Sequence, residues 1–268
     1  DCDAGDRGHP ARFGARLTDL LAASGLSVTT FTLAAAMTFG AAAIRGLTGF
    51  GMAIILVPLL GMVIEPSSAV VLAILLQLLI GPVGLRTILA DGDRATALPI
   101  AGIAMLATPL GLIALQATSP DVARLIIASV AIGAFVLVLL PMRPDGHRPS
   151  RTEIGLTGVA AGILTGFAAM PGPPVVPFYL RQRIEPRVAR ASMMLVFFGT
   201  AIAGSLSAFA LGAASVQTAV LAGALFVPML IGNWAGGLAF GRVPSPLWRS
   251  FVAVILGIAG VSAVLRLW

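Results

Sequence analysis

Long apolar runs fill most of the chain and are separated by short polar segments. The runs cover about residues 28–64, 67–90, 95–116, 121–141, 153–181, 187–211, 215–240 and 246–267. Runs of this length with few charges are typical of transmembrane helices. The pattern therefore predicts an all-α integral membrane protein whose core is helix packed against helix.

Three short motifs occur twice in the same order, which indicates an internal duplication. LTGF occurs at 47–50 and 164–167, IEP at 64–66 and 184–186, and SP at the start of an apolar run at 119–120 and 245–246. The offsets are nearly constant. We therefore divide the chain into a polar leader, a first repeat, a linker and a second repeat, with bounds 1–26, 27–142, 143–152 and 153–268.

The polar leader has two interpretations. Its apolar residues recur at helical spacing opposite charged ones, as in a short interfacial helix (Phe13, Leu17, Leu20 and Leu21 against Arg12, Arg16 and Asp19). The alternative is an ordinary polar leader.

The basic residues predict the orientation of the spans. All 17 are Arg, and most lie in short segments between apolar runs, as the positive-inside rule describes. Arg143, Arg148 and Arg151 place the linker in the cytoplasm. Three full spans on each side of the linker then put the first IEP outside and the second inside. The two halves are thus expected to be inverted repeats, as in many secondary transporters, with the N-terminus outside.

The first apolar stretch of each half must then enter and leave on the same side of the membrane. Residues 153–181 are 29 residues long, whereas two full spans need about 40. A re-entrant hairpin, or one span plus a half-span, fits better. Residues 28–64 leave more room, so two spans stay open there. Each repeat is expected to consist of a Gly- and Pro-broken hairpin followed by three transmembrane helices.

The break in the second half has the sequence ILTGFAAMPGPPVVP, residues 163–177. Broken backbone at membrane depth survives where it is buried in protein or lines a watery cavity, and a half-helix N-terminus attracts anions. Thr165 and Thr48 offer hydroxyl donors beside Gly166 and Gly49, and Pro173 and Pro174 suit the first turn of a new helix after Gly172. Helix packing is the alternative explanation for Gly158, Gly162 and Gly166, which are four residues apart.

Three polar side chains within the apolar runs are further candidates for an anion pathway. Arg45 precedes the first break and could bind an anion bidentately; an interfacial arginine that reaches water is the alternative. Gln77 favours a hydrogen bond between helices over a pathway role. Asn233 lies in IGNWAGG, where close packing competes with a pathway role.

The two segments GLTGFGMAIILVPLL and AAGILTGFAAMPGPPVVPFYL resemble the paired motifs of the TauE/SafE sulfite-exporter family, over about residues 28–267. The resemblance implies an inner-membrane, multi-pass transporter of small anions such as sulfite and organosulfonates. By motif position it implies that Thr48, Gly49, Phe50, Gly51, Thr165, Gly166, Gly172, Pro173 and Pro174 line the site. The chain departs from the family at Ala168, Ala169, Met170 and Pro171.

The sequence therefore predicts a transporter of small anions that is not an enzyme and needs no cofactor, metal or nucleic acid. An exporter of another small metabolite, a small carboxylate or a drug-like molecule, is the alternative. An intramembrane enzyme would need a general base or metal, and no His, Asp or Glu lies well within an apolar run. The candidate substrate-binding residues are Arg45, Thr48, Gly49, Phe50, Gly51, Gln77, Thr165, Gly166, Met170, Pro171, Gly172, Pro173, Pro174 and Asn233. The oligomeric state, the coupling ion and the direction of transport stay open.

Overall fold

The computed structural model describes residues 27–61, 63–123, 149–182 and 184–240, with residues 125, 126, 129, 130 and 133. The predicted interfacial helix, most of the linker, and most or all of the runs at 121–141 and 246–267 lie outside these residues. Within them every regular element is a helix. The helices are α2 (Val28–Thr48), α3 (Met52–Leu60), α4 (Pro66–Ile80), α5 (Leu85–Asp91), α6 (Arg94–Gln116), α8 (Arg151–Ala168), α9 (Gly172–Leu180), α10 (Pro186–Ala210) and α11 (Val216–Phe240).

Four of the described helices, α2, α6, α10 and α11, are long and apolar enough to cross a membrane. The expected span at 67–90 is bent: α4 and α5 meet at 82°, and counting them as one span makes a fifth. The bend follows from the sequence GPVG, in which Gly84 has a positive φ of 74°. The all-α membrane fold is thus confirmed for the described residues.

Local sequence sets where several helices begin. Ser150 and Glu153 form a capping box at the start of α8, in which each side chain accepts a hydrogen bond from the other residue's backbone. Pro66 is the first residue of α4 and Pro186 is the first residue of α10. An N–H at this position would have no partner within the helix, so proline costs no hydrogen bond there.

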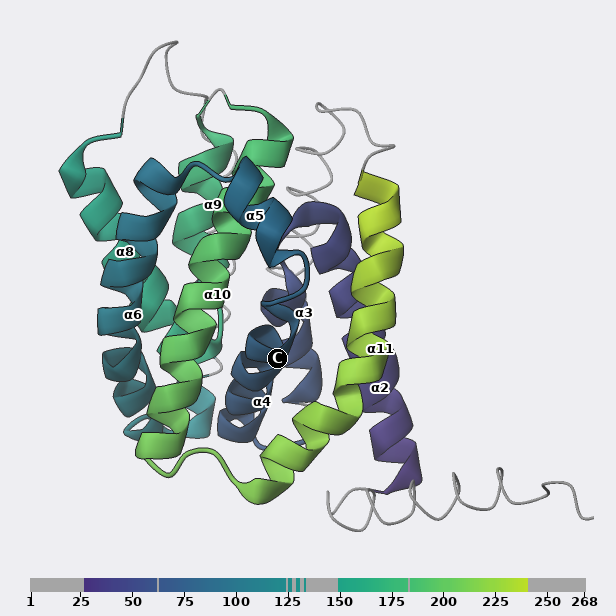
Figure 1. The fold of residues 1–268 in the computed structure, drawn as a ribbon. Coiled ribbons are helices and arrows are strands. Elements are labelled where there is room, and N and C mark those ends of the chain that lie inside the picture. Colours follow the sequence, from purple (N-terminus) through teal and green to yellow (C-terminus); the bar gives the residue numbers. More distant parts are fainter. Residues whose placement is uncertain are drawn as a thin grey trace, which may run out of the picture.

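Taken in chain order, the long helices of the two halves pair off with opposite directions: α2 with α8, α4 with α10, and α6 with α11 (Figure 1). In that view α2, α4 and α11 begin at the lower end, whereas α6, α8 and α10 begin at the upper end. The central helix α4 is buried along almost its whole length, so the core lies around it. The most extensive helix contacts join one half to the other, α6 with α8 and α2 with α11.

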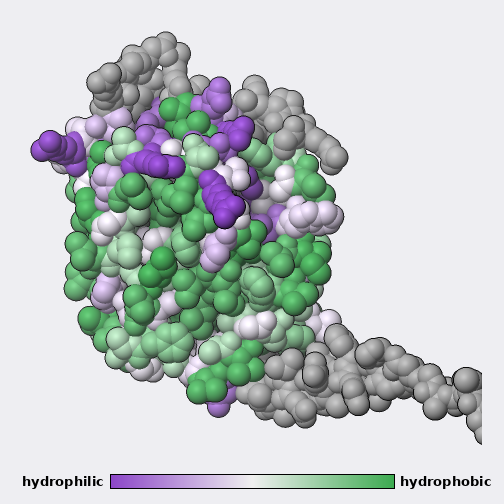
Figure 2. Space-filling view, viewed as in Figure 1, coloured by the Kyte–Doolittle hydropathy of each residue, from purple (hydrophilic) through white to green (hydrophobic). Residues whose placement is uncertain are grey.

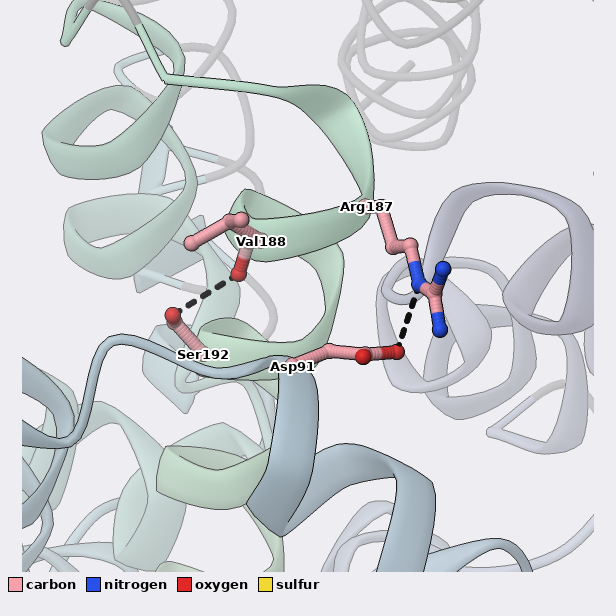
Figure 3. Close-up of polar contacts among 4 residues, drawn as sticks. All are labelled: Asp91, Arg187, Val188 and Ser192. Carbon is pink, nitrogen blue, oxygen red and sulfur yellow. Dashed lines mark hydrogen bonds and ion pairs between the residues drawn. The ribbon is translucent and has the colours of Figure 1, made fainter.

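Charged groups gather at one end of the bundle, and the rest of the visible surface is mostly apolar (Figure 2). At the charged end α5 meets the start of α10 (Figure 3). The Nε of Arg187 donates to Oδ2 of Asp91 at 2.7 Å, and the Ser192 hydroxyl donates to the Val188 carbonyl at 2.8 Å. The same hydroxyl accepts from the backbone N–H of Asp93 at 2.8 Å. Arg187 is 67% exposed, so this ion pair contributes little stability.

Glycine allows the close approach of α8 to α6, as the packing alternative anticipated. A Cβ on Gly166 would lie 2.1 Å from the carbonyl oxygen of Thr108, and a Cβ on Gly162 would lie 2.2 Å from that of Ala104. Backbone cannot move away as a flexible side chain can, so any larger residue must push the helices apart.

Gly166→Ala should therefore lower the free energy of unfolding by about 1–3 kcal/mol, the usual cost of overpacking. Gly155→Ala on the same helix is the matched control, because nothing lies within 4 Å of its added Cβ. The control should be neutral or up to about 1 kcal/mol more stable. Thermal unfolding of both purified variants checks this, and equal midpoints would contradict the packing account.

Candidate functional site

The backbone breaks of the two halves meet at a small cavity. Its volume is about 20 Å³, room for about one water molecule. Both breaks contribute to its wall, together with one residue each from α4 and α10. The lining residues are Arg45, Phe50, Gly51, Met52, Ala53, Ile54, Gln77, Ala169, Met170, Pro171, Gly172 and Phe197.

The first break uses two glycines in the left-handed conformation. Gly49 has φ 86° and ends α2, and Gly51 has φ 91° and precedes α3. The Thr48 hydroxyl holds the turn, since it accepts from the backbone N–H of Phe50 at 3.2 Å and donates to the carbonyl of Ile44 at 2.8 Å.

The second break is held by a residue from the first half. Ala169 ends α8 with φ 57°, an uncommon conformation for a residue with a Cβ. The Nε2 of Gln77 donates to the Ala169 carbonyl at 3.0 Å and so ties α4 to the break. The expected helix-to-helix hydrogen bond of Gln77 is thus found, and Gln77 also lines the cavity.

Both short helices begin at the cavity. Gly51 and Met52 at the start of α3, and Pro171 and Gly172 at the start of α9, belong to its lining. Neither helix has a side-chain cap. The first N–H groups of a helix have no partner within the helix, and α3 offers those of Met52, Ala53 and Ile54. Pro171, Pro173 and Pro174 have no N–H, so α9 offers only that of Gly172. The dipoles of both helices bring partial positive charge to the cavity.

Arg45 adds a full positive charge to the same wall. Its side chain is 5% exposed, so it does not reach water as an interfacial arginine would. Its Nη1 donates to Oδ1 of Asn233 on α11 at 2.7 Å. Within the described part of the chain Arg45 has no carboxylate partner, and its hydrogen bond is to a neutral amide.

Some candidates contribute to the structure around the cavity without lining it. Thr165 is buried and donates to the carbonyl of Ala161 at 2.7 Å, and Gly166 packs on α6. The two LTGF motifs also differ in place: Thr48 ends α2, whereas Thr165 lies three residues before the end of α8. Pro173 and Pro174 lie in the first turn of α9, as expected, but outside the lining.

Arg190 was not among the candidate residues, although it lies within the apolar run at 187–211. It lies in the first turns of α10, and its Nη2 donates to the carbonyl of Gly46 in α2 at 2.6 Å. Its guanidinium stacks over the Phe240 ring at 4.5 Å, and its Nε is buried without a hydrogen-bond partner. The available signal was Pro186, which starts the helix four residues before Arg190.

In the described residues, no group of three or more His, Cys, Asp or Glu residues is placed to hold a metal ion. The cavity instead combines helix N-termini with a buried arginine, which favours a negatively charged ligand. A family model described as Sulfite exporter TauE/SafE matches residues 33–263. No curated protein and no solved structure matches the chain.

Proposed function

Because the chain belongs to the TauE/SafE sulfite exporter family, we propose that it moves a small anion across the inner membrane by binding it at the cavity between the two breaks. Sulfite is the first candidate substrate, and organosulfonates, which present the same oxygen-rich anionic group, are the next.

The observation that carries the proposal is Arg45 at the junction of two uncapped helix N-termini. A buried cation without a carboxylate partner is unfavourable in an apolar bundle. An oxyanion at this point would receive charge-assisted hydrogen bonds from the guanidinium and from free backbone N–H groups. A cationic substrate would meet repulsion from the same groups.

We also propose that the two halves are inverted repeats. Two observations support it: α9 and α10 begin 120 residues after α3 and α4, and the helix directions in Figure 1 are opposite between the halves. In addition, a Cβ on Gly111 of α6 would meet the Ile163 carbonyl of α8, as one on Gly236 of α11 would meet the Ala43 carbonyl of α2. In this register Gly46 corresponds to Gly166, and the LTGF motifs are three residues out of step.

The cavity must open during transport. A space for about one water is too small for sulfite, which has four heavy atoms. The two breaks must therefore separate to admit the ligand. Phe197, at the middle of α10, places the cavity near the middle of the bundle, where inverted-repeat transporters bind their substrates.

The arginine-rich end of the bundle is assigned to the cytoplasm by the positive-inside rule. Arg94, Arg151 and Arg187 all lie in the first turn of helices that begin at this end in Figure 1. Export then means passage from this end to the opposite one, where α2 begins.

Small carboxylates are the alternative substrate class, because the Arg45 guanidinium can bind the two oxygens of a carboxylate in the same way as two oxygens of sulfite. Competition by acetate, methanesulfonate and a quaternary ammonium ion against sulfite separates the classes. Inhibition by the cation and not by the anions would overturn the anion assignment.

Flux of radiolabelled sulfite into proteoliposomes under an imposed potential tests the function. An inside-positive potential should accelerate uptake and an inside-negative potential should slow it, since each charge gains or loses about 2.3 kcal/mol per 100 mV. Empty liposomes are the control. Uptake equal to that of empty liposomes, with methanesulfonate and acetate also inactive, would overturn the proposal.

A further inference from the structure

Among the described residues, a second arginine close to the cavity also has no carboxylate partner. Arg190 is half-buried, and its guanidinium contacts the Gly46 carbonyl and the Phe240 ring, both of them neutral. Its Nε–H is buried and unpaired. Arg190 is also near enough for its charge to act unfavourably on Arg45.

A buried cation and a half-buried one, lying close together with no carboxylate beside them among the described residues, are costly for a fold. Burial removes water from each charge, and like charges repel more strongly in an apolar environment. The ion pair of Arg187 with Asp91 lies at the exposed end of the bundle and involves neither Arg45 nor Arg190. Because no carboxylate of the described residues is placed beside these two arginines, a bound anion is the natural partner for their charge.

A groove lined mainly by α11 leads from the surface to Arg190. It has a volume of about 690 Å³, and Arg190 and Asn233 are its polar lining among apolar residues. Trp234 and Ile231 are more than half exposed, so the groove opens outward. Asn233 lines the groove and holds Arg45, which lines the cavity, so their hydrogen bond joins the two spaces.

We propose that Arg190 is a second anion-binding residue, which captures the anion from this groove and passes it to Arg45 when the Arg45–Asn233 hydrogen bond opens. This inference rests on the proposed function. The unpaired Nε–H is buried in this structure. When the site opens, it and a neighbouring Nη–H supply the two parallel donors that bind an oxyanion bidentately. The transfer changes only hydrogen bonds, and no covalent bond forms or breaks.

A purely structural role for Arg190 makes a different prediction. Its Nη2 satisfies a carbonyl in the last turn of α2, where cations stabilise a helix end. Glutamine at this position keeps an N–H donor for Gly46 but removes the charge. If Arg190 is only structural, Arg190→Gln should change the thermal stability by the same amount at every anion concentration. If Arg190 binds the anion, the substitution should raise the anion concentration that is needed to stabilise the protein.

The experiment is thermal unfolding of the full chain in a maltoside detergent, titrated with sulfite against gluconate at constant ionic strength. The variants are Arg190→Gln, Arg190→Lys and the control Arg187→Gln, which removes a charge three residues away at an exposed position. The sulfite concentration that gives half of the maximal stabilisation should be the same for wild type and Arg187→Gln; this concentration is the sulfite midpoint. Arg190→Gln should need roughly 10–100 times more sulfite, and Arg190→Lys, which keeps the charge without the fork, should be intermediate.

A midpoint for Arg190→Gln equal to that of Arg187→Gln would overturn the role of Arg190 while leaving the transport function standing. If Arg190→Gln does not fold, an unchanged midpoint in Arg190→Lys would overturn it. Arg190-dependent stabilisation by phosphatidylglycerol with none by sulfite would make Arg190 a lipid site and overturn the proposal. No sulfite effect in wild type, together with no flux, would overturn the proposed function itself.

Discussion

Arg45→Gln is expected to reduce sulfite flux roughly 10–100-fold while making the anion-free protein more stable. Loss of one charge-assisted contact costs about 1.5–3 kcal/mol of binding, which corresponds to that factor. The same change removes a buried charge that has no carboxylate partner among the described residues, and glutamine still offers an N–H to Asn233. The melting temperature without anion should therefore rise.

The two opposite signs distinguish this result from simple damage, which lowers flux and stability together. Arg187→Gln serves as the matched control, because Arg187 is 67% exposed and touches neither the cavity nor the groove. Flux is measured in proteoliposomes of equal protein content and unfolding in detergent. Unchanged flux in Arg45→Gln would remove Arg45 from the binding site.

Asn233→Asp is expected to have the second large effect, because it places a carboxylate beside Arg45, which has no carboxylate partner among the described residues. Oδ1 of residue 233 lies 2.7 Å from Nη1 of Arg45, and Asn233 shares the groove with Arg190. A carboxylate there would pair with the guanidinium and compete with any external anion. We expect higher stability without anion, sulfite-dependent stabilisation reduced at least about tenfold, and flux reduced by a similar factor.

Asn233→Ala is the partner variant, since it removes the hydrogen-bond acceptor and adds no charge. It should lower stability without anion, because Arg45 loses its acceptor, and it should keep or strengthen sulfite binding. Calorimetric titration of the three proteins with sulfite provides the comparison. If Asn233→Asp and Asn233→Ala bind sulfite equally, the charge at this position is irrelevant to the site.

Several features of the site could not be predicted from the sequence, because they depend on contacts between segments that are far apart in the chain. Arg45 and Asn233 are 188 residues apart, and Gln77 and Ala169 are 92 apart. Both Gln77 and Asn233 were candidates because polar groups in apolar runs are rare, but their partners had no signal in the sequence. Arg190 was missed for the same reason: among four arginines around RQRIEPR, its burial depends on α2 and on Phe240.

The sequence by itself determined the membrane class, the presence of a break in each half and the family. Apolar run length, glycine and proline act locally, through the hydrophobic thickness of a bilayer and through the allowed backbone angles, so they can be recognised without any partner. The tertiary structure decided which side of each break faces the cavity, and that Thr165 and Gly166 support packing while Met170, Pro171 and Gly172 line the space. It also decided that two arginines lie together in an apolar bundle, because charge compensation depends on distances between helices, and those distances are set by how the helices pack.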